Sequence, residues 1–383
     1  MRAKERTKYY KTLNDSYRLK LYFLIIIFLI LSFFLILDFM YTKFIHTQTK
    51  IIGIRHKVFH HHLLPNENAT EGGGIFPSIK IYTNSLGFRD FANREIDLKN
   101  KNRIIFIGDS FTFGSLVEFK FTVPGLAYDY FANKGIEVLN AGLSSYSPSI
   151  YYNKIKFFIE QGLKFSHLVV FIDISDIEDE AIRYLTEEKT LYVKTASPKI
   201  ELKEKIKKFL DENFIVSYKL IKFVDDRLID PIIEGNFTPF ATTNTANEFI
   251  EHIVSKKYKR DKWTIDEDVR KEYNIGIERS VRYITLLKDL LDKNNIKLTI
   301  VVYPWFTQIY HQDLNSIQVK IWKEFSEKNN NQFINLFPTF ISEENKNLEI
   351  YEKILLDFIP YDVHWNQRGT KKVFENFIKE FKY

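Results

Sequence analysis

Short apolar runs alternate with longer stretches of helical periodicity along most of the chain, from about residue 103 onward. The short runs are almost wholly apolar, which is typical of strands buried on both faces of a sheet. These predicted strands are residues 103–108, 137–140, 168–174, 297–303 and 332–336. The predicted helices are residues 122–134, 149–161, 267–293, 315–329 and 366–381. The alternation predicts an α/β domain whose central parallel sheet is flanked by helices.

A separate apolar segment lies near the N-terminus. Residues 21–37 are uncharged, and the apolar character continues past Asp38 to residue 41. About 20 residues form a helix of about 30 Å, which is long enough to cross a membrane. A cleaved signal peptide is the alternative, but its apolar region is usually shorter, and no small-residue cleavage site follows this run. The sequence therefore predicts an uncleaved, single-pass anchor at residues 21–41.

The charge of the 383-residue chain is concentrated in its N-terminal tail. Residues 1–20 hold seven basic and two acidic side chains, which is most of the formal net charge of +6. The rest is nearly neutral, so a domain-wide basic surface for nucleic acid is excluded. A basic tail before an anchor predicts that residues 1–20 are cytoplasmic and that the domain lies outside the cytoplasm, in a bacterial cell envelope. The chain has no cysteine, which excludes disulfides, thiolate metal sites and a thiol nucleophile.

The remaining segments suggest how the chain is divided. Residues 42–100 are predicted as a juxtamembrane connector and lead-in, because a glycine run at 72–74 and nearby prolines mark loops. The α/β domain is predicted over 101–383, with an insertion at about 185–263 where the alternation breaks down. A basic cluster at 256–260 within the insertion is interpreted either as a solvated face or as a contact with anionic lipid or glycan.

One serine lies at the edge of the predicted sheet where α/β folds usually bind their ligands. The first predicted strand leads directly into Asp109 and Ser110, at the carboxyl end of the sheet. A serine nucleophile needs a base within hydrogen-bond reach. His364 is the best candidate, because it also lies in a loop that leads into a helix, and Asp362 two residues earlier can orient its imidazole.

Two other clusters resemble metal ligands. His60, His61 and His62 are adjacent, but they lie in a predicted loop without partner carboxylates. The acidic residues between 173 and 180 lack the glycine and the spacing of a calcium-binding loop, so they predict a solvated or locally capped turn. We expect neither cluster to bind a metal.

Four sequence blocks, in order, resemble the SGNH/GDSL hydrolase superfamily. They are GDSFTFG at 108–114, NAGLSSYS at 140–147, DISD at 173–176 and DVHWN at 362–366. Upstream, TNSLGFRD at 83–90 resembles a lead-in segment of bacterial members. The resemblance covers roughly residues 80 to 380. It implies a flavodoxin-like sheet and cofactor-free acyl-ester chemistry by a Ser-His-Asp triad.

Carried over by position, Ser110 resembles the nucleophile of the family, His364 the general base and Asp362 its orienting partner. Ser110 also matches a residue whose backbone N–H contributes to the oxyanion hole. The two other oxyanion positions depart from the family pattern. Ser145 replaces a glycine but keeps the backbone N–H. Ser175 replaces an asparagine, and loss of one such donor typically costs about 2.7–4 kcal/mol of transition-state stabilisation.

These features lead to two functional hypotheses. The first is a membrane-anchored serine esterase or O-acyltransferase acting on acyl esters of envelope glycans or lipids. Similar anchored members transfer acyl groups beside a membrane-bound O-acyltransferase, which is therefore an expected partner. The alternative is a catalytically drifted assembly or glycan-binding subunit, because Ser145 and Ser175 depart from the pattern.

Overall fold

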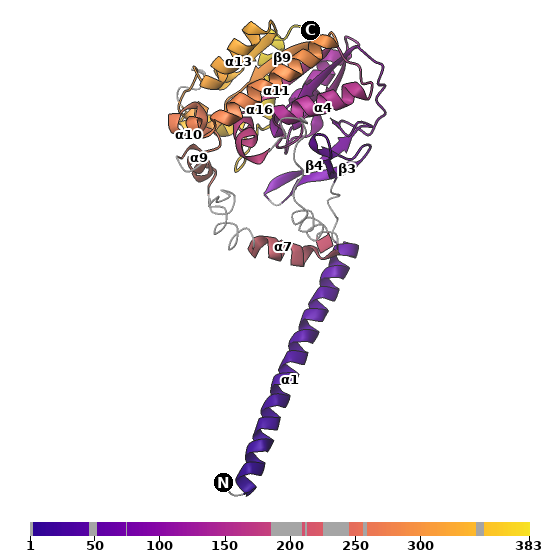
Figure 1. Cartoon of the computed structure of the whole chain (residues 1–383), viewed down its shortest axis with the longest axis vertical. Helices are drawn as coiled ribbons and strands as arrows, with labels where there is room; N and C mark the ends of the chain where they lie inside the picture. Colours follow the sequence, from indigo (N-terminus) through magenta and orange to yellow (C-terminus); the bar gives the residue numbers. More distant parts are fainter. Residues whose placement is uncertain are drawn as a thin grey trace. The chain divides into compact units, whose positions relative to one another are not determined.

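The computed structural model describes residues 3–45, 52–73, 75–184, 209–210, 213–224, 245–255, 259–341 and 348–383. The chain divides into two compact units (Figure 1). One comprises Met1–Gln48 and Ala196–Thr238, and the other comprises Thr49–Thr195 and Pro239–Tyr383. Each unit is described by itself below.

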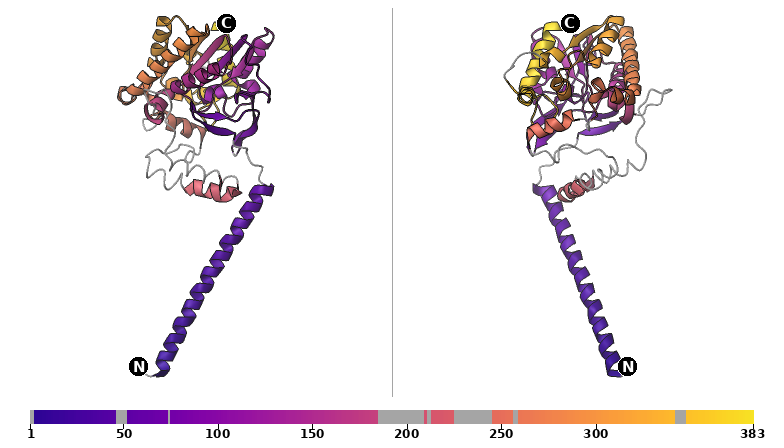
Figure 2. Two further views of the ribbon diagram at one scale, coloured as in Figure 1. Left: turned by 45° about the vertical axis from the view of Figure 1, so that its right-hand side comes forward. Right: turned by 90° about the vertical axis from the view of Figure 1, so that its left-hand side faces the viewer.

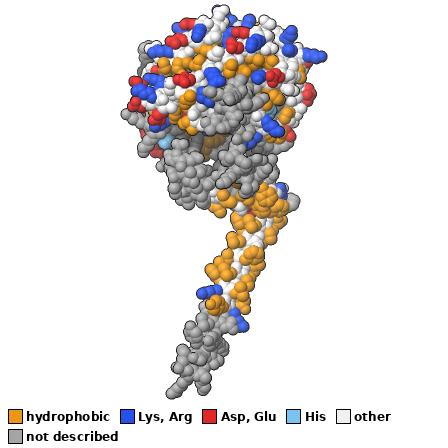
Figure 3. Space-filling view, viewed as in Figure 1, with side chains coloured by type: hydrophobic (Ala, Val, Ile, Leu, Met, Phe, Trp, Pro, Cys, Tyr) orange, Lys and Arg blue, Asp and Glu red, His pale blue; other side chains and the backbone are white. Residues whose placement is uncertain are grey.

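The first unit contains a long apolar helix. Helix α1 spans Ala3–Met40 and continues into a π-helical turn, η1, at Tyr41–Ile45. Its 24-residue stretch Lys20–Lys43 has a mean hydropathy of 3.0 and is long and apolar enough to cross a membrane. Hydrophobic side chains are exposed along this stretch (Figure 3). Such a helix suits a membrane anchor or a signal sequence.

A second helix packs against the end of α1. Helix α7 spans Ile215–Val224, and the carboxylate of Asp38 accepts hydrogen bonds from the backbone N–H groups of Val216 and Ser217 at 2.9 and 2.8 Å. These N–H groups belong to the first turn of α7, where a helix leaves its donors without internal partners. Asp38 interrupts the apolar run because it satisfies those donors.

The second unit is built on an eight-stranded mixed sheet within its described residues, in the order β10-β9-β8-β6-β7-β5-β4-β3. The strands are β3 (Asn68–Gly73), β4 (Phe76–Thr83), β5 (Arg89–Asp90), β6 (Arg103–Ile107), β7 (Glu137–Asn140), β8 (His167–Ile172), β9 (Lys297–Val302) and β10 (Gln332–Asn335). The strands from β10 to β7 pair in parallel, whereas β5, β4 and β3 continue the sheet antiparallel. The parallel part has the doubly wound order 2-1-3-4-5 of flavodoxin-like folds. The predicted α/β fold is confirmed.

The segment predicted as connector and lead-in adds three strands to this sheet. β3, β4 and β5 all come from residues 42–100. A separate two-stranded sheet, β1 (Gly53–His56) with β2 (His60–Leu63), also forms there. β3 alternates exposed and partly buried residues and is polar, so it lacks the apolar signal that identifies the central strands.

Helices cover both faces of the sheet (Figure 2). Helix α3 (Val123–Ala132) packs against α16 (Gln367–Glu380), and α4 (Pro148–Glu160) packs against α11 (Asn274–Lys293). The others are α2 (Ser110–Phe113), η2 (Phe119–Phe121), α5 (Asp176–Glu178), η3 (Asp179–Arg183), α9 (Ala246–Val254), η6 (Lys262–Thr264), α10 (Glu267–Glu272), α12 (Phe306–Tyr310), α13 (Ile317–Lys328), α14 (Phe337–Phe340) and α15 (Ile350–Asp357). The helix predicted over 267–293 is divided at Tyr273 into α10 and α11.

Much of the predicted insertion, about 185–263, lies outside the described residues. So do residues 256–258 of its basic cluster. The described part of the cluster pairs with carboxylates, because Lys259 contacts Glu272 at 2.9 Å and Arg260 contacts Asp179 at 2.9 Å. Carboxylates of the protein itself therefore neutralise Lys259 and Arg260.

Candidate active site

Ser110 is placed by a tight passage from strand to helix. All five residues of β6 are buried, and the chain then passes through Gly108 and Asp109 into α2. A Cβ on Gly108 would collide with the Thr112 hydroxyl and the Phe171 carbonyl, so only glycine fits there. The Asp109 side chain accepts from the N–H of Phe111 at 2.9 Å and caps the turn. Ser110 remains partly exposed.

His364 is placed by a turn that precedes the last helix. Phe358 and Trp365 form an antiparallel bridge across this turn, and the N–H of Ile359 donates to the His364 carbonyl at 2.9 Å. Asn366 then caps α16 by accepting from the N–H of Gly369 at 3.0 Å. The backbone of the turn is therefore held at both of its ends.

The structure brings Ser110, His364 and Asp362 together. His364 Nε2 lies 2.7 Å from Ser110 Oγ, and His364 Nδ1 contacts Asp362 Oδ1 on its other side. The same carboxylate oxygen accepts from the backbone N–H of His364 at 2.8 Å. A carboxylate can only accept, so Nδ1 carries the proton and Nε2 is left as the acceptor for the serine hydroxyl.

The charges of His364 and Asp362 stabilise each other. Burial lowers the pKa of His364, but the charge of Asp362 and the hydrogen bond to it outweigh burial, so the pKa is raised above its usual value. Burial raises the pKa of Asp362, but His364 outweighs that effect and holds the pKa below its usual value. Asp362 therefore stays ionised and stabilises a protonated His364.

Asp109 is a second carboxyl group near the serine. Burial and the nearby charge of Asp173 raise the pKa of Asp109 to about 8, so the group is mostly protonated at neutral pH. Its Oδ2 lies 3.3 Å from Ser110 Oγ, which is longer than the distance to His364. A protonated carboxyl is also a poorer acceptor than an imidazole nitrogen, so His364 is the better base for Ser110.

Ser145 adopts the backbone conformation of a glycine. Its φ is 61°, in the left-handed region that non-glycine residues rarely occupy. The loop that carries Ser145 lies directly against α2, because a Cβ on Gly142 would collide with Thr112. Among the described residues, the Ser145 N–H donates to no acceptor. The group is therefore available beside the turn that carries Ser110.

The backbone N–H of Ser175 is not available to an oxyanion, because it already donates to another group. The residue is buried, and its N–H donates to Asp173 Oδ1 at 2.7 Å. Within the described part of the chain, its hydroxyl has no hydrogen-bond partner, so the hydroxyl is the group left for a ligand. The structure thus offers one short side-chain donor at the position where the resemblance implies an amide.

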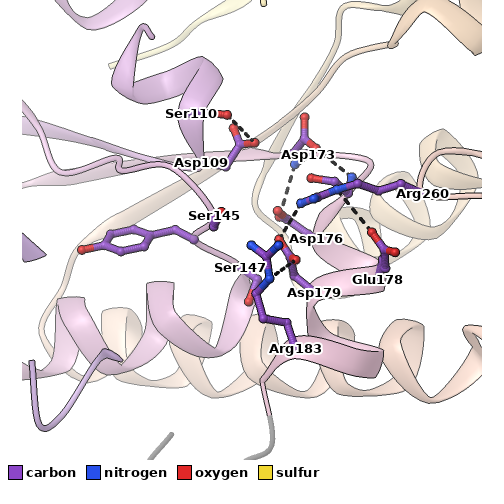
Figure 4. A network of polar contacts seen from close by, with 12 residues as sticks. Asp109, Ser110, Ser145, Ser147, Asp173, Asp176, Glu178, Asp179, Arg183 and Arg260 are labelled. Carbon is purple, nitrogen blue, oxygen red and sulfur yellow. Dashed lines mark hydrogen bonds and ion pairs between the residues drawn. The ribbon is translucent and has the colours of Figure 1, made fainter. Parts of the chain in front are cut away.

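The acidic run after β8 forms a locally capped turn, one of the two predicted alternatives, because Asp173 Oδ1 accepts from the Ser175 N–H at 2.7 Å. The turn is not solvated, since most of its carboxylates are buried. Figure 4 shows their polar contacts. Asp173 accepts from the Trp305 indole at 2.7 Å, and Asp176 accepts from the Tyr151 hydroxyl at 2.9 Å. The remaining buried members are Asp179, which contacts Arg260, and Glu180, which contacts Ser147. Hydrogen bonds from neighbouring elements replace water around these groups.

The described residues contain no cluster of three or more side chains that is suited to a metal ion. The histidine run is engaged elsewhere. His61 Nε2 lies 2.8 Å from the Ser144 carbonyl, and His62 Nε2 lies 2.7 Å from the Leu86 carbonyl. His60 and His61 contact each other through their Nδ1 atoms at 2.8 Å.

Arg89 is a site residue that the sequence did not identify. It is fully buried, and its guanidinium donates to the carbonyls of Phe113 and Gly114 at 2.8 and 2.6 Å, and to the Val117 carbonyl. The first two carbonyls end α2, the helix that begins at Ser110, and the third lies in the loop that follows. The lead-in resemblance at 83–90 marked this segment, but its contact with α2 is a tertiary feature.

No family model and no curated protein matches the chain. Among solved structures, it is similar to a catalytic mutant of an acetylxylan esterase from Geobacillus stearothermophilus (13% identity, 74% of this chain, 95% of that chain, TM-score 0.37). It is also similar to a GDSL-like lipase from Bacteroides thetaiotaomicron (11% identity, 73% and 86%, TM-score 0.35). A third is a psychrotrophic esterase from Pseudoalteromonas (10% identity, 73% and 96%, TM-score 0.33). At these identities and TM-scores the likeness to GDSL-type esterases carries no argument about the site, whose assignment rests on its own geometry.

Proposed function

We propose that the chain is a membrane-anchored serine esterase or O-acyltransferase of the SGNH type, acting on acyl esters of envelope glycans or lipids. The observation that supports this most directly is the 2.7 Å approach of His364 Nε2 to Ser110 Oγ, with Asp362 on the other side of the ring. Hydroxyl, imidazole and carboxylate in this order are the groups that acyl transfer through a serine requires.

The first half-reaction forms an acyl-enzyme. Ser110 Oγ attacks the carbonyl carbon of the ester while its proton passes to His364 Nε2. Asp362 stabilises the imidazolium that results. The tetrahedral intermediate then collapses, and the leaving alkoxide takes the proton from His364. The acyl group remains on Ser110.

The second half-reaction removes the acyl group. His364 accepts a proton from water or from a sugar hydroxyl, and that oxygen attacks the acyl-enzyme. Water gives hydrolysis, and a sugar hydroxyl gives transfer. Both outcomes use the same residues, so the acceptor alone distinguishes an esterase from an O-acyltransferase.

We assign the developing oxyanion to the backbone N–H groups of Ser110 and Ser145, with the Ser175 hydroxyl as a third donor. Ser145 N–H is supported by its position beside α2 and by its lack of an acceptor among the described residues. Because Ser175 supplies a hydroxyl rather than an amide, we expect slower turnover than a complete set of amide donors would give.

The apolar stretch Lys20–Lys43 supports a membrane anchor. The basic residues of the tail support a cytoplasmic N-terminus and an extracytoplasmic domain. A membrane-bound O-acyltransferase is the partner that would supply acyl groups in the transferase version. A C-terminal alkaline phosphatase fusion should be active in cells, because that enzyme works only outside the cytoplasm. If this fusion were inactive and a C-terminal cytoplasmic reporter were active, the proposed topology would be wrong.

Hydrolysis of an aryl acetate by the full chain in detergent micelles tests the proposal. Wild-type protein should release the aryl alcohol, and Ser110→Ala should abolish release while remaining folded. The same assay with an added glycan acceptor separates the two outcomes. If the rate of aryl alcohol release does not depend on the acceptor, an esterase is favoured. If the glycan becomes acylated, a transferase is favoured.

The replacement of the amide donor by Ser175 favours one alternative, a drifted assembly or glycan-binding subunit. A serine-directed fluorophosphonate distinguishes the two hypotheses. Labelling of wild type that is lost in Ser110→Ala supports the enzyme, and absence of labelling on folded wild type supports the subunit.

A further inference from the structure

The loop that carries Ser145 is held on both sides by side chains from other elements. His61, on β2, contacts the Ser144 carbonyl oxygen through Nε2 at 2.8 Å. Tyr184, at the end of η3, donates its hydroxyl to the Ser145 carbonyl oxygen. The two peptide groups that flank the Ser145 Cα are therefore each fixed by a side chain far away in sequence.

The contact with His61 has a geometric consequence. The carbonyl of Ser144 and the N–H of Ser145 belong to one trans peptide, whose C=O and N–H point in opposite directions. Fixing the carbonyl toward His61 therefore fixes the N–H toward the opposite side of the loop. A hydrogen bond to the carbonyl also polarises the amide, which makes its N–H a stronger donor.

We infer that His61 is a positioning residue for catalysis, which aims and polarises the Ser145 N–H through the Ser144–Ser145 peptide. The inference rests on the proposed function, because it assigns the Ser145 N–H to the oxyanion. It also gives the histidine of the β1–β2 hairpin a role that does not involve a metal.

The protonation state of His61 suits this role. Burial lowers the pKa of His61 to about 4, so the ring is neutral in the pH range of most assays. A neutral ring has a single N–H, and the carbonyl of Ser144 requires it at Nε2. Nδ1 of His61 is then an acceptor, and Nδ1 of His60 at 2.8 Å can donate to it. The contact is therefore maintained at neutral pH.

His61 is itself held in place by the core. The Tyr146 hydroxyl donates to the His61 carbonyl at 2.7 Å, and Lys154 Nζ contacts that hydroxyl at 3.1 Å. The His61 ring also packs edge-on against Tyr146, with ring centroids 4.8 Å apart. A rigid support of this kind is what a positioning residue needs, because orientation is lost when the supporting group can move.

The left-handed backbone of Ser145 requires such support. A non-glycine residue in this region costs on the order of 1–2 kcal/mol and persists only where its surroundings determine it. The hydrogen bonds from His61 and Tyr184 fix both neighbouring peptides. Without His61, the Ser144–Ser145 peptide is free to rotate toward a more relaxed conformation, which turns the N–H away.

The test compares three variants of the full chain in detergent micelles. His61→Phe removes the donor and keeps a ring, whereas His61→Gln keeps an N–H donor. His62→Phe is the matched control, because His62 is the next residue on β2 and makes the same kind of contact, but with the Leu86 carbonyl. Turnover of an aryl acetate is expressed per Ser110 titrated with fluorophosphonate, so that misfolded protein does not count.

We expect His61→Phe to lower kcat by roughly 10- to 100-fold with little change in KM, which is somewhat less than the loss of a whole oxyanion donor. His61→Gln should recover most of that loss. His62→Phe should lower thermal stability but leave kcat per titrated site unchanged. The pH midpoint of turnover should stay the same in all three, because none of them alters Asp362 or His364.

Failure of the proposed function can be distinguished from failure of the role assigned to His61. If wild-type protein shows no Ser110-dependent hydrolysis, the proposed function is wrong and the inference falls with it. If wild type is active but His61→Phe retains full kcat, the proposed function stands and the role of His61 is wrong. An equal kcat loss in His62→Phe would also overturn it, because the effect would then be structural.

Discussion

Lys154 Nζ donates a hydrogen bond to the carbonyl oxygen of Ala141 at 2.8 Å, inside the core of the α/β unit. The same nitrogen contacts the Tyr146 hydroxyl at 3.1 Å and lies 4.7 Å from the centre of the Phe88 ring. Burial lowers the pKa of Lys154 well below its usual value. A neutral amine retains two N–H donors, which is the number that these two oxygens require.

This burial predicts how stability depends on pH. Between the folded pKa and the unfolded value near 10.5, the unfolded chain binds a proton at Lys154 that the folded chain does not. Stability therefore rises with pH in that window, by up to about 1.4 kcal/mol per pH unit. Lys154→Met should remove this slope, measured by urea unfolding at pH 7 and pH 9.

Lys156→Met is the matched control for that experiment, because Lys156 lies two residues further along α4 and is partly exposed. If Lys154→Met and wild type differed by the same free energy of unfolding at both pH values, Lys154 would carry its proton in the folded state throughout.

The central strands could be predicted from the sequence because burial on both faces leaves an apolar run. β7, predicted over 137–140, matches the observed strand, and β6, β8, β9 and β10 differ by one or two residues at their ends. β5 could not be predicted in this way, because it is two residues long and consists of Arg89 and Asp90. Its place in the sheet depends on pairing with β4 and β7, which no local pattern reports.

Arg89 gives a prediction about α2, the helix that begins at Ser110. Arg89→Met removes a shared donor from the buried carbonyls of Phe113, Gly114 and Val117, of which the first two keep a second, longer hydrogen bond. The loss should cost about 1–3 kcal/mol of the free energy of unfolding. It should also lower kcat per titrated Ser110, because the helix that Ser110 begins loses its support. Arg89→Lys should restore little, since an ammonium cannot match the planar guanidinium fork.

Arg94→Met is the control for Arg89→Met. Arg94 follows on the same segment and pairs with Asp90 at 3.1 Å and Glu137 at 2.5 Å, away from α2. We expect it to lower stability without changing kcat. An equal kcat loss in Arg94→Met would mean that Arg89 acts on general stability and not on α2.

The backbone of Ser145 predicts a substitution that raises the stability of the protein. Glycine adopts a φ of 61° without the steric cost of a Cβ, so Ser145→Gly should raise the free energy of unfolding by about 0.5–1 kcal/mol. Activity should be retained, because the backbone N–H remains. Ser144→Gly, one residue earlier at a position without positive φ, should instead lower stability. A stability loss in Ser145→Gly would show that the serine hydroxyl outweighs the backbone strain.

The sequence could single out Ser110, Asp362 and His364, which the structure brings together, but not the side chains that surround them. Ser110 and the pair Asp362 and His364 each sit in a short local motif, so sequence blocks identify them. No local motif identifies His61, because its contact is with a carbonyl 83 residues away. Only the folded chain brings the β1–β2 hairpin to the Ser145 loop.

The pH dependence of acylation tests the pair Asp362 and His364 directly. His364 must be neutral to accept the proton of Ser110, and its pKa is raised above 6.5 because the charge of Asp362 outweighs burial. The rate of acyl-enzyme formation should therefore rise with pH, and the midpoint of this rise should lie above pH 6.5. Asp362→Asn removes the charge that raises the pKa and leaves the burial that lowers it, so the midpoint should move to lower pH. The rate should also fall, by roughly 10²- to 10⁴-fold, because the ring loses its orienting partner.

The measurement is the rate of aryl acetate acylation between pH 5 and pH 9 for wild type, Asp362→Asn and Asp357→Asn. Asp357 is a buried carboxylate of the same segment, but it pairs with Arg368 at 2.6 Å and Lys372 at 3.0 Å. Its substitution should cost stability while leaving the midpoint where it is, because those partners lie on α16 and not at the serine. A midpoint that stayed fixed in Asp362→Asn would show that the charge of Asp362 does not reach His364. The titrating group that controls acylation of Ser110 would then be a group other than His364, and the assignment of His364 as the base would be wrong.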